Sequence, residues 1–167
     1  RDSTGIVTSA RRHDTWDRDR AIDLYVVALT PPDDGDGIRC LTAHGGRYQA
    51  PSVSPDGTVV AFVGFADPST YPQNARVGIL PLDSVDAPES AIRWISIGLD
   101  RTFEPSAGSS APVWESDAHL LAIAEDRGAT RLYRLPADGS FVPAPLTDGP
   151  VTVTSFDAAA RVVATAR

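Results

Sequence analysis

The chain repeats one short pattern three times, and this repetition limits the possible folds more than any other feature of the sequence. Each copy contains an apolar anchor residue, a turn and a short apolar run; the copies are residues 51–63, 112–124 and 154–166. Each anchor lies six residues before the first apolar residue of its run, and the anchors are Val53, Trp114 and Phe156. Self-similarity of this kind indicates one supersecondary unit that is used several times along the chain.

Two further elements recur between these copies. The first is a Leu-Tyr segment, found at residues 23–29, 131–137 and, in a weaker copy, 76–82. The second is a Leu-Thr segment, found at residues 39–42, 93–96 and 144–147. One unit therefore contains four short elements in a fixed order, which are the anchor, the central run, the Leu-Tyr segment and the Leu-Thr segment.

All four elements have the sequence character of β-strands. The central run at 59–63 is β-branched and aromatic and is bounded by Asp56-Gly57 and Gly64. It is apolar at consecutive positions, which is typical of a strand buried on both faces. Asp-Gly pairs at 56–57, 138–139 and 148–149 supply the positive φ that tight turns require. The 14 prolines leave little room for a long helix.

Four antiparallel strands repeated every roughly 40 to 60 residues are typical of a β-propeller. We therefore predict an all-β fold, a partial β-propeller of four-stranded antiparallel blades that spans residues 1–167. The predicted parts are a partial blade at 1–42, blades at 51–97 and 112–147, and the start of another at 154–167. A β-sandwich with chance self-similarity is the alternative. Because closed propellers typically have four to eight blades, we expect an open arc with uncovered apolar faces that aggregates in isolation.

Composition excludes several classes of partner. The formal net charge of −7 disfavours nucleic acid and an anionic membrane surface as partners. No apolar run approaches the roughly 18 residues that a membrane-spanning helix needs. The single cysteine, Cys40, excludes an internal disulfide, and this scarcity fits a cytoplasmic location. The chain has no Met and begins with Arg1, so we expect it to be part of a longer polypeptide.

The repeat resembles that of a known group of proteins. Residues 51–62, 24–27 and 39–42 resemble the WD40-like repeat of TolB-type propellers. The same repeat builds the N-terminal propeller of the prolyl oligopeptidase (S9) family of serine peptidases. Two sets of segments resemble blades of the acylaminoacyl-peptidase-like members of that family. They are residues 9–14 followed by 23–27, and residues 124–128, 132–139 and 145–149. The second and third copies of the anchor segment lack Pro-Asp-Gly, a departure that affects only the turn.

The resemblance implies that this chain has no catalytic activity of its own. In the S9 family the propeller covers the active site of a C-terminal α/β-hydrolase domain and restricts entry to peptides and small substrates. We therefore predict a non-catalytic propeller segment that gates peptide access, with the hydrolase domain and peptide substrates as partners and proteolysis performed outside this chain. The alternative is a TolB-like propeller that acts as a protein-interaction module with no enzyme attached.

The residues themselves give no catalytic, cofactor or metal site. A hydrolase nucleophile would lie in G-x-S-x-G, but the nearest serine cluster, Gly108-Ser109-Ser110, lacks the second glycine. His13, His44 and His119 show no metal-ligand spacing. The acidic stretch 33–37 lacks the closing carboxylate of a calcium loop, because position 45 is Gly, so it is predicted to be a solvated hairpin tip.

Five residues have competing interpretations. Cys40 has no His or Cys neighbour in sequence and is predicted to be a buried structural thiol. Trp114, Tyr133 and Phe156 fall on repeat positions and are predicted to belong to the blade core. Trp16 differs, because it lies in the charged stretch 11–20. The plainer interpretation of this stretch is a solvated loop, and the sharper one is a loop that faces the hydrolase and shapes the substrate route.

Overall fold

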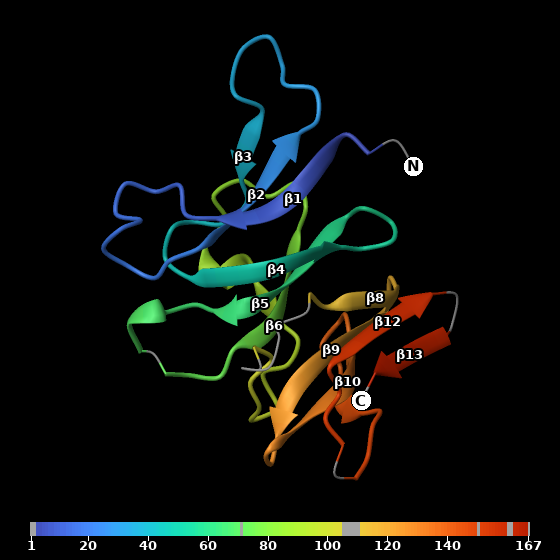
Figure 1. Cartoon of the computed structure of the whole chain (residues 1–167). Coiled ribbons are helices and arrows are strands. Elements are labelled where there is room, and N and C mark those ends of the chain that lie inside the picture. Colours follow the sequence, from blue (N-terminus) through green and yellow to red (C-terminus); the bar gives the residue numbers. More distant parts are fainter. Residues whose placement is uncertain (1–2, 71, 105–110, 150, 160–161, 167) are drawn as a thin grey trace.

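A computed structural model describes residues 3–70, 72–104, 111–149, 151–159 and 162–166, and these residues form four antiparallel sheets (Figure 1). The first sheet contains β1 (Gly5–Ala10), β2 (Asp23–Ala28) and β3 (Ile38–Cys40). The second contains β4 (Arg47–Val53), β5 (Val59–Phe65), β6 (Arg76–Pro81) and β7 (Arg93–Trp94). The third contains β8 (Val113–Ser116), β9 (His119–Asp126), β10 (Ala129–Pro136) and β11 (Ala144–Pro145). A hairpin of β12 (Ser155–Ala159) and β13 (Val162–Ala166) follows.

The predicted fold class is confirmed. Every sheet is an antiparallel meander in which consecutive strands pair, and the sheets follow one another in chain order (Figure 1). The helical segments in the described ranges are two three-residue 3₁₀ turns, η1 (Pro68–Thr70) and η2 (Glu89–Ala91). No helix in these ranges is long or apolar enough to cross a membrane. The architecture is a partial β-propeller, because each sheet packs face to face on the next.

The central strands are apolar on both faces because both faces are covered. On β5, Phe62 is fully buried with Leu24 and Leu41 of the first sheet. The next residue, Val63, is buried in a different cluster with Leu120 of the third sheet. Strand β9 alternates in the same way between the second sheet and the β12–β13 hairpin. Consecutive side chains of a strand point to opposite faces, so a strand between two neighbouring sheets needs an unbroken apolar run.

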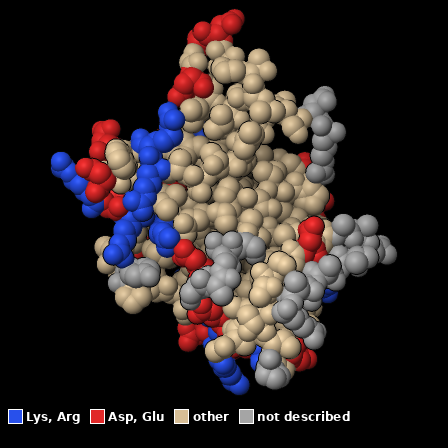
Figure 2. Space-filling model, in the orientation of Figure 1, with Lys and Arg blue, Asp and Glu red and all other residues tan. Residues whose placement is uncertain are grey.

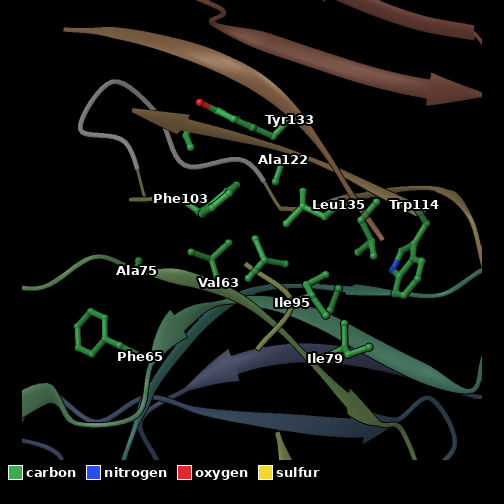
Figure 3. Packing of buried hydrophobic residues seen from close by; sticks show 14 residues of the cluster. Val63, Phe65, Ala75, Ile79, Ile95, Phe103, Trp114, Ala122, Tyr133 and Leu135 are labelled. Carbon is green, nitrogen blue, oxygen red and sulfur yellow. The ribbon is translucent and has the colours of Figure 1, made fainter. Parts of the chain in front are cut away.

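Figure 3 shows the core between the second and third sheets. Phe103 and Tyr133 meet edge to face at 6.0 Å between ring centroids. Trp114 is 9% exposed in this core, and its indole Nε1 donates a hydrogen bond of 3.0 Å to the carbonyl oxygen of Ser52 on β4. This bond satisfies the polar end of the ring and joins two sheets. The prediction that Trp114 and Tyr133 are core residues is confirmed.

Each of the three Leu-Thr segments ends in a residue with a side-chain hydroxyl. The hydroxyls of Thr42, Ser96 and Thr147 each accept a hydrogen bond from a backbone N–H on the central part of the sheet, at 3.2, 2.9 and 3.2 Å. The donors are the second residues of the Leu-Tyr segments, namely Leu24, Val77 and Leu132. The repeated sequence segments therefore occupy equivalent positions in three sheets.

The Asp-Gly turns have the predicted backbone. Gly57, Gly139 and Gly149 have φ values of 76°, 69° and 76°, which favour glycine. In the first of these turns the Asp56 carboxylate accepts hydrogen bonds from the hydroxyl of Ser54 at 2.6 Å and from Thr58. These bonds, led by that from Ser54, lower the pKa of Asp56 below 3.8.

Several residues differ from their predicted settings. The anchor Val53 is 39% exposed, and Phe156 is only partly buried against the third sheet. Cys40 is half-buried rather than buried, and its thiol donates to the carbonyl of Thr42. The stretch 33–37 is a largely exposed tip between β2 and β3, as predicted. Gly108-Ser109-Ser110 lies outside the described residues.

Candidate functional site

A cleft of about 760 Å³ lies at the edge of the first sheet where β1 ends and β2 begins. It is lined by the loop between these strands, by the linker between β3 and β4, and by residues 67–69 of the second sheet. Figure 2 shows basic and acidic side chains side by side over the flank of the molecule that carries this loop in Figure 1. The cleft is therefore charged and polar at its rim.

Asp23, the first residue of β2, is the centre of the polar network in this cleft. It is fully buried. Its Oδ1 accepts a hydrogen bond of 2.9 Å from the Thr42 hydroxyl, and its Oδ2 lies 2.6 Å from Nδ1 of His44. A buried carboxylate needs such partners, because without them its desolvation would strongly destabilise the fold. Thr42 is the same residue whose hydroxyl caps the Leu24 N–H, so the repeat geometry positions the carboxylate.

His13 lies beside this carboxylate and is held from its other side. The ring is 8% exposed, and its Nε2 lies 2.9 and 3.1 Å from the two carboxylate oxygens of Asp19. Its Nδ1 lies 3.7 Å from Oδ2 of Asp23 and has no hydrogen-bond partner. The rings of His13 and His44 are 5.6 Å apart between centroids. Two imidazoles therefore converge on one buried carboxylate.

Asp19 is itself fixed by the loop that contains it. Its carboxylate accepts hydrogen bonds from the Thr15 hydroxyl at 2.6 Å and from the Ala21 backbone N–H at 2.9 Å. The bond from Thr15, followed by those from Ala21 and His13, lowers the pKa of Asp19 to about 2. Asp19 is therefore a carboxylate at neutral pH, and Nε2 of His13 donates to it.

The repeat places an equivalent residue in each of the first three sheets, and an aspartate occupies this position in the first sheet. The position of Asp23 is occupied by Arg76 in the second sheet and by Arg131 in the third. Arg131 pairs there with Asp126 at 3.1 Å, and Arg101 pairs with the same carboxylate at 2.7 Å. The aspartate in the first sheet is thus a departure from the repeat.

The structure brings together two of the three histidines that show no ligand spacing in sequence. His13 and His44 meet because the ends of β1 and β3 lie at the same edge of the sheet. His119 lies elsewhere, in a second cleft of about 500 Å³ between the second and third sheets that also contains Asp56 and Asp117. The absence of sequence spacing is therefore no argument against a shared site for His13 and His44. The sequence feature that indicates the site is Asp23, because the equivalent positions of the repeat are Arg76 and Arg131.

The charged stretch 11–20 forms most of one wall of the cleft. Trp16 is 56% exposed at its surface. Arg12 pairs with Asp36 on the β2–β3 tip at 3.3 Å, and both side chains are at least half exposed. Exposed pairs of this kind contribute little to stability. Apart from the buried His13, most residues of the stretch are exposed, as the plainer interpretation predicts.

Comparisons with known proteins agree with this architecture. No protein-family model and no curated protein matches the sequence. Among solved structures, TolB from Acinetobacter baumannii superimposes with a TM-score of 0.59 at 15% identity, covering 90% of this chain and 32% of TolB. A puromycin-hydrolyzing peptidase from Mycobacterium tuberculosis superimposes with a TM-score of 0.55 at 20% identity, covering 87% of this chain and 22% of the peptidase.

The chain has a TolB-like β-propeller fold. It spans about a third of the length of the TolB chain and less than a quarter of the peptidase chain. At identities of 15% and 20% these similarities establish the fold and not the activity.

Proposed function

We propose that the chain is a non-catalytic propeller segment of an S9-type serine peptidase and gates peptide access to a separate α/β-hydrolase domain. The observation that carries this proposal is the similarity to a solved peptidase over 87% of the chain. In the chain itself, His13 and His44 are paired with aspartates and not with a serine or cysteine nucleophile. These pairings support a steric role for the segment.

The outer face of the first sheet supports a place in a larger ring. Val7 and Val26 point to the second sheet and pack on its core. Ile6, Val27 and Ile38 pair across the sheet, so they share the opposite face, and Ile6 is 55% exposed. Strand β1 is also an edge strand, whereas β5 and β9 have neighbours on both sides. An apolar face beside an open edge fits a further blade packed against it.

The gating role makes a prediction for the loop that lines the cleft. In the full-length protein, deletion of residues 13–20 should raise kcat/KM for long peptides more than for dipeptide substrates, because a steric restriction is removed. The matched control is deletion of residues 33–35 in the tip between β2 and β3, which keeps Asp36, the partner of Arg12. That deletion should leave the ratio unchanged. Hydrolysis rates on a peptide series of increasing length give the result.

Equal kinetics for the loop deletion and the intact protein on long and short peptides would contradict a role of the loop in restricting substrate entry. Hydrolysis of any peptide by the purified 167-residue chain would contradict a purely steric role.

The second candidate is a TolB-like interaction module with no enzyme attached, which the TolB superposition favours. The coding sequence that follows Arg167 separates the two. A G-x-S-x-G segment followed by Asp and His supports the peptidase, because these residues form the triad of α/β-hydrolases. An early stop codon supports the interaction module.

A further inference from the structure

The His13–Asp23–His44 cluster contains a ring nitrogen without a hydrogen-bond partner, and this nitrogen indicates a ligand site. Nδ1 of His13 is buried, has no hydrogen-bond partner, and lies 3.7 Å from Oδ2 of Asp23. Nearly all buried polar atoms in folded proteins have a partner. Because Nε2 of the same ring donates to the Asp19 carboxylate, the neutral ring presents a lone pair at Nδ1 toward a carboxylate. A cation bound between these two acceptors would satisfy both of them.

The donor atoms have the chemistry and the spacing of a transition-metal site. One nitrogen of each histidine and one oxygen of Asp23 lie within 4.8 Å of one another. Ligand atoms at about 2.0–2.1 Å from a tetrahedral zinc ion are about 3.3–3.4 Å apart. The observed separations of 3.7 Å from His13 and 2.6 Å from His44 to Asp23 bracket this value. Imidazole nitrogen with one carboxylate favours zinc over calcium or magnesium.

The surroundings of these atoms match those of metal ligands. A histidine that binds a metal through one nitrogen commonly donates from the other to a carboxylate, and Asp19 holds Nε2 of His13 in this way. A ligating carboxylate is commonly hydrogen-bonded by a further group, and the Thr42 hydroxyl donates to the second oxygen of Asp23. His44 is half exposed and lines the cleft, so an ion has a route from solvent.

We propose that His13, Asp23 and His44 bind one zinc ion, with its fourth position open to the cleft. The ion takes the place of the proton that joins Nδ1 of His44 to Asp23. His44 binds it as the other neutral tautomer, with the ring proton on Nε2 instead of Nδ1. The metal ties the loop between β1 and β2 to the linker between β3 and β4, because one histidine comes from each. It therefore fixes the charged loop 11–20 on the edge of the first sheet.

Isothermal titration calorimetry of the purified 167-residue chain with ZnCl₂ tests this site. We expect saturable binding of one zinc ion per chain and a higher Tm in the presence of zinc, since a ligand that binds only the folded state stabilises it. His44→Ala should weaken binding at least tenfold. The buried Asp23 keeps its hydrogen bond from the Thr42 hydroxyl in this variant, so the variant should fold, which circular dichroism would verify.

Two variants control for other ligands. His119→Ala removes a histidine from the second cleft and should bind zinc like the unmodified chain. Cys40→Ser removes the single thiol and should also bind zinc normally. Absence of one-to-one binding, an unchanged affinity in His44→Ala, or a comparable loss in either control variant would overturn the proposed site.

Discussion

Gly64→Ala should destabilise the chain by about 3 kcal/mol, at the upper end of the cost of overpacking a core. Gly64 lies on the central strand β5 opposite Tyr48 of β4. A Cβ at this position would lie 1.9 Å from the backbone carbonyl oxygen of Arg47. Backbone cannot move aside as a flexible side chain can, so the β4–β5 pairing would have to open. Urea denaturation followed by circular dichroism measures the loss.

Gly45→Ala is the matched control, since a Cβ at Gly45 would meet nothing within 4 Å. Its free energy of unfolding should change by less than about 1 kcal/mol, as at most surface sites. Equal stability of the two variants would contradict the close approach of β4 and β5.

Phe62→Ala should cost about 3–5 kcal/mol, the usual range for truncating a fully buried aromatic side chain. The ring is 0% exposed and meets the rings of Tyr48 and Trp94 at centroid distances of 5.3 and 5.8 Å. It packs in the cluster that joins the first two sheets. Its loss leaves a cavity between blades, which neighbouring rings on rigid strands cannot fill. Equilibrium unfolding in urea gives the change.

Phe141→Ala is the matched control for Phe62→Ala, because it removes the same side chain from an exposed position. Phe141 is 53% exposed near the β10–β11 connection, so its truncation should cost less than about 1 kcal/mol. If Phe62→Ala were as mild as Phe141→Ala, the two sheets could not be packed on each other as described.

The fold could be predicted from the sequence because its physical cause is local and repeated. A run such as residues 59–63 is apolar at consecutive positions, and this pattern has few explanations besides a strand covered on both faces. Repetition then favours sheets stacked on one another. Burial of individual anchors was harder to predict. Val53 shares its repeat position with Trp114 but is 39% exposed. The spacing of the repeat predicts where a strand lies, whereas the burial of its side chains depends on the elements packed against it.

The cluster in the cleft could not be predicted from spacing. His13 follows β1 and His44 follows β3, and only the sheet topology brings these strand ends together. Metal motifs recognised from sequence rely on ligands a few residues apart on one element. Asp23 was the visible sign, since its counterparts in the repeat are Arg76 and Arg131, but its burial depends on Thr42.

Amide hydrogen exchange on β1 tests most directly whether this chain is an arc of a larger propeller. Strand β1 is the edge of the first sheet, whereas its counterparts β5 and β9 are flanked on both sides. We predict that β1 amides exchange more slowly in the full-length protein than in the 167-residue chain, while β5 amides exchange alike in both. Identical β1 exchange in the two proteins would show that no further strand covers this edge and would contradict the account.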